Sequence, residues 1–151
     1  MAVTAFWYGK AILNAFGGET AGESIAIDFL SDTIKVSLHT STYTPAQDTD
    51  EFWDAATNEV SGAGYTTGGA TLGTKTLGYT AGTNVIKFDA ADTSWASSTI
   101  TARYAVIYKD TGTPSTSPLL GYVNFGADVV TSNGTFQITW DAAGIFTITP
   151  A

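Results

Sequence analysis

The sequence contains no cysteine, and this absence excludes disulfide bonds and thiolate metal ligands. It also contains a single histidine, and only six lysine and arginine residues against fourteen aspartate and glutamate residues. The formal net charge is therefore -8. Nucleic acids and anionic membrane surfaces are bound through cationic side chains, so we expect neither as a partner.

Long apolar runs are absent as well. No segment approaches the roughly 20 consecutive apolar residues that a transmembrane helix needs. Residues 1–18 are apolar, but no basic residue precedes the apolar stretch and Lys10 interrupts it. The sequence therefore predicts neither a membrane span nor a signal peptide, and we expect synthesis in a cytoplasm.

The residues that are abundant favour β-structure. Hydrophobic residues make up 44% and aromatic residues 13% of the chain, whereas charged residues make up only 13%. Small polar, aromatic and β-branched residues suit a pleated, half-buried surface better than a helix face. The length favours one domain over residues 1–151, large enough to form a core without metal or disulfide.

Alternating apolar and polar residues predict most of the strands. The pattern runs through residues 31–40, 84–90, 99–109 and 135–140. Residues 99–109 become apolar on both faces toward their end, which predicts a central strand. Residues 119–126 follow across a loop and are the predicted hairpin partner of that strand.

Turn residues complete the predicted fold class. Asn133-Gly134 predicts a tight turn, and residues 145–149 read as a strand that returns after the strand at 135–140. No strand–helix–strand alternation appears, which argues against a nucleotide-binding α/β fold. The sequence therefore predicts an all-β protein, an antiparallel β-sandwich or jelly-roll-like domain.

One short helix is expected at the N-terminus. Apolar residues between Phe6 and Phe16 lie near helical spacing, and Gly17-Gly18 supply a stop. We therefore expect residues 1–18 to form a helical arm.

The predicted connection at residues 41–73 is long, polar, rich in turn residues and irregular. Long ordered connections tend to be functional or to pack on a partner. Its glycine-rich part, NEVSGAGYTTGGATLG at residues 58–73, satisfies neither the phosphate-loop nor the dinucleotide-binding pattern. We interpret this part as a pinned loop or an irregular edge strand.

Candidate catalytic and metal-binding groups are weak. His39 lies on the predicted polar face of a strand and reads as a surface residue, and residues 22–26 match a nucleophile elbow poorly. The acidic cluster at residues 48–54 reads as a solvated turn, with calcium binding or a paired-carboxylate glycosidase as alternatives. We predict no enzyme, no catalytic residue, no cofactor and no metal site.

Five collinear stretches resemble a known group of proteins. They are FWYGKAILNA, TIKVSLHTSTYTPAQD, NEVSGAGYTTGGATLG, TITARYAVIY and NGTFQITWDAAGIFTI. Their order resembles small structural proteins of tailed bacteriophages, several of which are similar to capsid decoration (cement) proteins. Residues 16–29 depart from this resemblance because the connection there is longer.

The resemblance implies a decoration protein on the outer surface of the head, made in the cytoplasm of a host bacterium. The implied partners are the major capsid protein and the chain itself, as a homotrimer in the virion. A tail- or fibre-associated structural protein and a carbohydrate-binding β-sandwich are the alternatives. We expect the capsid or subunit contacts at large aromatic residues: Phe6, Trp7, Tyr8, Tyr43, Phe52 and Trp53. The first three have an alternative role as part of a helix that caps the domain's own core.

Overall fold

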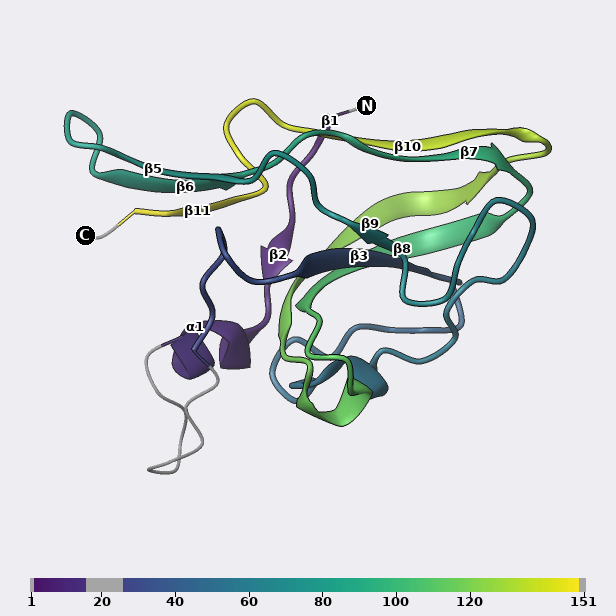
Figure 1. Ribbon diagram of the computed structural model, residues 1–151, viewed down its shortest axis with the longest axis horizontal. Helices are drawn as coiled ribbons and strands as arrows, with labels where there is room; N and C mark the ends of the chain where they lie inside the picture. Colours follow the sequence, from purple (N-terminus) through teal and green to yellow (C-terminus); the bar gives the residue numbers. More distant parts are fainter. Residues whose placement is uncertain (1, 16–25, 150–151) are drawn as a thin grey trace.

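The computed structural model describes residues 2–15 and 26–149 and shows a mostly β protein (Figure 1). Strands make up 45% of the chain and form several antiparallel sheets, with one short helix near the N-terminus of the described residues. The predicted fold class is therefore confirmed. The elements are β1 (Ala2–Val3), β2 (Phe6–Trp7), α1 (Gly9–Ala15), β3 (Ile34–His39), β4 (Ala70–Thr71), β5 (Thr76–Thr80), β6 (Val85–Asp89), β7 (Thr93–Ser98), β8 (Thr101–Lys109), β9 (Leu119–Val130), β10 (Gly134–Trp140) and β11 (Phe146–Ile148), with 3-10 turns at Trp53–Ala55 and Pro114–Thr116.

The lower layer is a five-stranded sheet, which we call the body sheet. Its order is β2-β9-β8-β3-β4, so that β8 is the middle strand, as its two apolar faces predicted. β8 and β9 pair antiparallel and form the predicted hairpin. Val106 and Ile107, adjacent residues on opposite faces of β8, are both 0% exposed, so this strand is covered on both sides.

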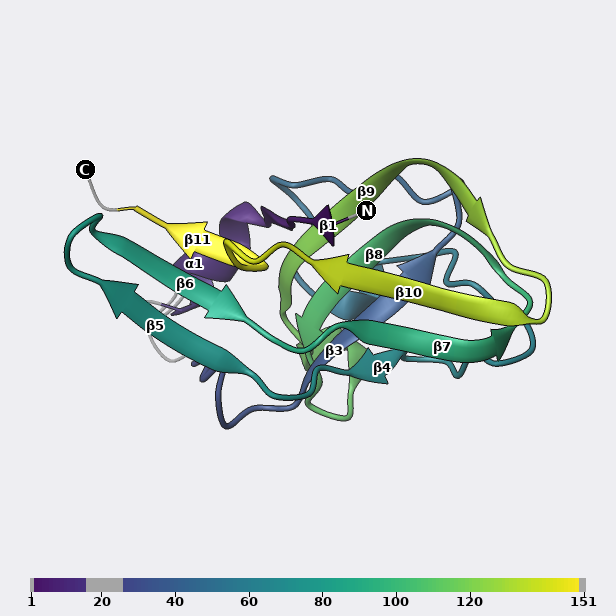
Figure 2. The same ribbon diagram turned by 90° about the horizontal axis from the view of Figure 1, so that it is seen from above.

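The upper layer contains two three-stranded sheets, β1-β10-β7 and β11-β6-β5. Figure 2 shows that β6 leads into β7 and β10 leads into β11, so the two sheets follow one another along this layer. The β1-β10-β7 sheet covers the body sheet. The β11-β6-β5 sheet extends past the end of the body sheet and lies above α1 (Figure 1).

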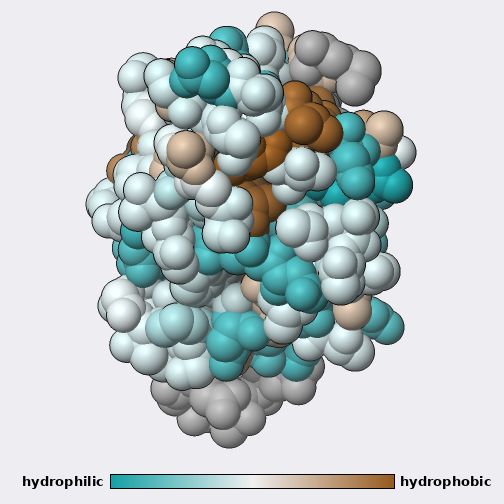
Figure 3. All heavy atoms as spheres, turned by 90° about the vertical axis from the view of Figure 1, so that its right-hand side faces the viewer, coloured by the Kyte–Doolittle hydropathy of each residue, from teal (hydrophilic) through white to brown (hydrophobic). Residues whose placement is uncertain are grey.

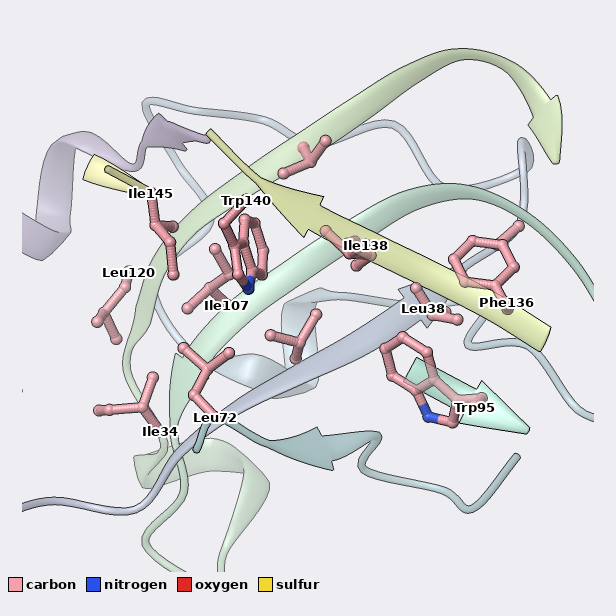
Figure 4. Close-up of a cluster of buried hydrophobic side chains, with 14 of the residues drawn as sticks. Ile34, Leu38, Leu72, Trp95, Ile107, Leu120, Phe136, Ile138, Trp140 and Ile145 are labelled. Atoms are coloured by element: carbon pink, nitrogen blue, oxygen red, sulfur yellow. The ribbon is translucent and has the colours of Figure 1, made fainter. Parts of the chain in front are cut away.

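The main core lies between the β1-β10-β7 sheet and the body sheet. Figure 4 shows Trp95, Phe136 and Ile138 in one cluster with Leu38 and Ile107. All five side chains are buried. Burying a side chain of this size contributes roughly 1.5–3 kcal/mol, so this layer interface is the main source of stability.

Two predicted connections lead elsewhere than expected. Asn133 adopts a φ of 49° in the turn after β9, but the turn joins the two layers, since β10 pairs with β1 and β7. The strand after β10 pairs with β6 and does not return along β10. A bend at Asp141–Gly144, where the Gly144 N–H donates to the Asp141 carbonyl at 2.8 Å, redirects the chain.

The N-terminal helix is shorter than predicted. Phe6 and Trp7 form β2 and pair with Tyr122 and Gly121 of β9, and α1 begins only at Gly9. Consecutive bulky aromatic residues favour strands over helices, and here β9 offers them a partner. A Cβ atom at Gly121 would collide with the Phe6 carbonyl, so this pairing requires glycine. The last part of the predicted arm, residues 16–18, lies outside the described residues.

The long connection is irregular, as predicted: its first part packs beneath the body sheet, where Trp53 stacks on Tyr108, and its glycine-rich part runs against β3 and β7. It contains only a 3-10 turn and the two-residue strand β4, which pairs with β3. Its glycine-rich part is pinned at both ends: a Cβ at Gly69 (φ 74°) would collide with the Val36 carbonyl, and one at Gly64 (φ 75°) would lie 2.8 Å from the Ala96 carbonyl. The interpretation as a pinned loop with an irregular edge strand is confirmed.

Candidate functional site

An apolar groove of about 540 Å³ lies between α1 and the overhanging β11-β6-β5 sheet. We call β5, β6 and their turn, residues 76–89, the arm, and this hollow the arm groove. None of the described residues that line the arm groove carries a charge. The lining residues are Trp7, Ala11, Ile12, Ala15, Ile27, Phe29, Leu77, Gly78, Tyr79, Ile86, Phe88, Leu120 and Ile148.

Aromatic rings make the floor of the arm groove rigid. Trp7 stacks on Phe146 with ring centroids 4.1 Å apart, and its edge meets Phe88 at 5.4 Å. Phe29 meets the same Phe88 ring edge-on, also at 5.4 Å. The floor is therefore preformed, which lowers the entropic cost of binding.

The outer wall of the arm groove is exposed. Leu77 and Tyr79 of β5 are 45% and 61% exposed, and they share one face of the strand. Residues 76–86 contain no charged side chain. At the base of the arm, the Lys75 ammonium donates to the Asp32 carbonyl, which ties the arm to the segment before β3. This geometry suits the binding of an apolar surface.

The opposite end of the molecule differs. Figure 3 faces that end and shows a mainly hydrophilic surface with one limited hydrophobic patch. β9 ends on this side, and its Val129 and Val130 are 40% and 67% exposed. A shallower hollow bounded partly by Val130 is lined by several threonine and serine residues and by Glu59. The arm groove is the more apolar of the two surfaces.

His39 is fully buried, and the prediction of a surface histidine is wrong. Its Nδ1 lies 2.8 Å from the Thr57 carbonyl and its Nε2 lies 2.8 Å from Ser37 Oγ. Because the carbonyl can only accept, Nδ1 carries the proton and Nε2 accepts from the serine hydroxyl. Trp53 Nε1 donates to the same Ser37 Oγ at 3.0 Å. Burial lowers the His39 pKa to about 4, so the ring is neutral at pH 7.

The Ser37–His39 pair has the spacing of a nucleophile and its base, but not the access that catalysis needs. Both residues are 0% exposed, and neither lines the arm groove or the hollow at the opposite end. Trp53 covers them, stacked on Tyr108 with ring centroids 4.9 Å apart. The long connection buries this face of β3, and the hydrogen bonds of Ser37 and His39 satisfy the polar groups there.

Two of the predicted contact residues lie in the protein interior. Tyr8 and Tyr43 are 0% and 3% exposed, and their hydroxyl oxygens lie 2.8 Å apart. The Tyr43 hydroxyl donates to Asp50 at 2.9 Å. Burial raises the pKa of both tyrosines, which stay protonated. Tyr8 and Tyr43 are therefore removed from the candidate contacts.

The other four predicted contacts differ in their exposure. Phe6 is 55% exposed, and Trp7 is half-buried in the floor of the arm groove. Phe52 and Trp53 are also half-buried, the first in a bridge with Pro118. Two half-buried tryptophans held against the chain's own rings and two in the core leave no freely exposed tryptophan for stacking on a sugar.

Sequence reasoning missed the arm. Leu77 and Tyr79 alternate with small residues just before a turn-forming stretch. The alternation at 76–80 and the predicted strand at 84–90 together indicate a hairpin. β5 and β6 do form this antiparallel pair.

The acidic cluster forms a turn. Asp48 and Asp54 are exposed, Asp50 accepts from the Ala46 N–H at 3.0 Å, and Glu51 lies 3.5 Å from the Lys10 ammonium. Across residues 2–15 and 26–149, no three His, Asp or Glu side chains come close enough together to hold a metal ion. No helix within these ranges has the length and apolar character needed to cross a membrane.

Comparison of the chain with protein-family models, with curated proteins and with solved structures finds no match. The sequence resemblance and the surface of the molecule therefore carry the functional argument. On that surface, the arm groove combines an apolar lining with exposed apolar residues beside it.

Proposed function

We propose that this chain is a bacteriophage capsid decoration protein that binds the outer surface of the head and stabilises the shell by apolar contact. The observation that carries the proposal is the arm groove: a preformed, uncharged hollow beneath a projecting hairpin. The sequence resemblance to phage structural proteins supplies the partner, which is the major capsid protein. The protein then belongs to the virion and acts without a chemical reaction or a cofactor.

Binding through the arm groove depends on the removal of apolar surface from water. Leu77 and Tyr79 expose large apolar areas at the outer wall of the groove, and Trp7 lies in its floor. Burial stabilises a contact by roughly 25 cal/mol per Å² of apolar area, before the costs of association are subtracted. Copies held together in a homotrimer would bind with added avidity and need no further type of contact.

The lack of charge at the arm groove fits the overall charge of the chain. A net charge of -8 repels acidic surfaces over most of the molecule, whereas residues 76–86 carry no charge. An apolar contact at this site is also insensitive to salt. We therefore expect attachment to the head to persist at high ionic strength.

The test is the composition of purified phage particles. Quantitative mass spectrometry of whole particles and of tailless heads should find this chain in both, at a fixed ratio to the major capsid protein. Presence on whole particles but absence from tailless heads would favour the tail- or fibre-associated alternative. Absence from both would contradict a role in the virion.

A further inference from the structure

β5 is an open sheet edge of a kind that the other terminal strands of the described sheets do not show. It is the terminal strand of the β11-β6-β5 sheet, and all five of its residues are exposed. Strand edges carry unpaired N–H and C=O groups and readily pair with another strand. Alternate residues of β5 turn these groups away from β6.

The other terminal strands of the described sheets are short or covered. β1, β2 and β4 have two residues each, and β11 has three. The longer edge strand β7 lies against the glycine-rich segment, where the Thr99 N–H donates to the Ala63 carbonyl at 3.0 Å. Within the described residues, β5 is thus the one terminal strand of five or more residues that has no other segment against it.

β5 also lacks the features that usually protect an edge. Residues 76–80 contain no charged residue and no proline, and the pairing of β5 with β6 runs through five consecutive residue pairs without a bulge. The neighbouring charged side chains have partners within the chain: Lys75 is directed to the Asp32 carbonyl, and Lys87 and Asp89, which lie opposite Gly78 and Thr76 on β6, form an ion pair at 3.2 Å. The strand is therefore free to accept a partner along its whole length.

The sequence of β5 is symmetric in character about its middle residue. It reads Thr76-Leu77-Gly78-Tyr79-Thr80, with glycine at the centre, one apolar residue on each side and threonine at both ends. We propose that β5 pairs antiparallel with β5 of a second copy, about a two-fold axis at Gly78. The two arms then form one continuous six-stranded sheet.

This register places apolar residues opposite apolar residues and threonines opposite threonines. Leu77 of one copy lies opposite Tyr79 of the other, twice, on the groove face. Thr76 of one copy lies opposite Thr80 of the other, twice, on the outer face. The arm grooves of the two copies then lie on the same side of the joined sheet. Such a self-complementary surface is what a two-fold contact requires.

The charge distribution favours a second copy at this edge. Two copies with a net charge of -8 repel one another across most of their surfaces, but the arms meet without charge between residues 76 and 86. The contact is two-fold, so it is separate from the threefold contact that the phage resemblance implies. It also does not depend on attachment to a capsid.

A charge pair on the outer face tests the register and leaves the arm groove intact. In T76K/T80K, each lysine faces a lysine of the other copy. In the matched control T76K/T80E, each lysine faces a glutamate. The side chains of Thr76 and Thr80 are exposed and do not line the groove, so both variants should fold as the wild type does.

Sedimentation velocity over a range of protein concentrations measures the outcome. We expect a micromolar or weaker dimer for the wild type, a dimer at least about tenfold weaker for T76K/T80K, and near wild-type affinity for T76K/T80E. If net charge alone decided the affinity, T76K/T80K would dimerise more tightly than the wild type. Its two added lysines change the net charge of each copy from -8 to -6 and so weaken the repulsion between copies.

A second readout locates the contact. Hydrogen exchange at the β5 amides should slow as the wild-type concentration rises, and this slowing should disappear in T76K/T80K. A wild type that stays monomeric at every concentration would overturn the proposal. So would a dimer or trimer that T76K/T80K leaves unchanged, since the contact would then lie elsewhere.

Discussion

The body sheet and the arm are both antiparallel β-structure, but they differ in what covers them. β8 of the body sheet carries buried side chains on both faces, whereas β5 of the arm is exposed along its whole length. β6 is half-buried throughout, between these extremes. Strands covered on two sides supply stability, and strands covered on one side or less leave surface for a partner. We therefore assign the stability of the fold to the body sheet and binding to the arm.

The largest expected difference is in core truncation. Ile107→Ala removes a fully buried side chain from β8 and should lower the free energy of unfolding by about 2–5 kcal/mol. Leu77→Ala, at a 45% exposed position of β5, should change it by less than about 0.5 kcal/mol. Denaturant unfolding of both variants measures the difference. Equal losses would mean that the arm is part of the folding core.

Acid sensitivity should come from the body sheet, because the chain's one histidine lies there. Burial holds the pKa of His39 at about 4, below its ordinary 6.5. The unfolded chain therefore takes up the proton first as the pH falls. The stability that the neutral ring contributes is complete above pH 6.5 and is lost as the pH falls toward 4, by about 3 kcal/mol.

The variant His39→Asn isolates this contribution. Burial raises the pKa of Glu59, so the folded chain takes up this proton first and gains stability as the pH falls, opposite to the effect of His39. Glu59 is present in both proteins, so its effect cancels when their pH profiles are compared. Unfolding measured between pH 7 and pH 4 should show a steeper loss of stability in the wild type than in His39→Asn. Parallel pH profiles would mean that His39 is not buried as the structure has it.

Alternation in the sequence predicts β3 and β8 of the body sheet, and the apolar segment after the following loop predicts the β8–β9 hairpin. Alternation failed for His39 because a period of two assumes that one face meets water. The long connection covers that face of β3 with Trp53 and Tyr43, and only the tertiary structure reveals this. The same packing explains why Tyr43 is interior.

The site was predicted only in part for a related reason. The sequence predicts contacts at large aromatic residues because such residues dominate binding surfaces. One of them, Trp7, lines the arm groove. The groove itself depends on how far the β11-β6-β5 sheet projects past the body sheet. That projection follows from the bend at Asp141–Gly144 and from the pairing of β11 with β6, neither of which a local pattern specifies.

The most direct measurement of the central claim is rebinding to phage particles that lack this chain. Leu77→Ser/Tyr79→Ser alters the exposed side of the arm groove, and the matched control Val129→Ser/Val130→Ser alters exposed apolar residues at the far end of β9. We predict at least about a tenfold loss of occupancy for the first variant and wild-type occupancy for the second. Full occupancy by the arm variant would contradict the assignment of binding to the arm.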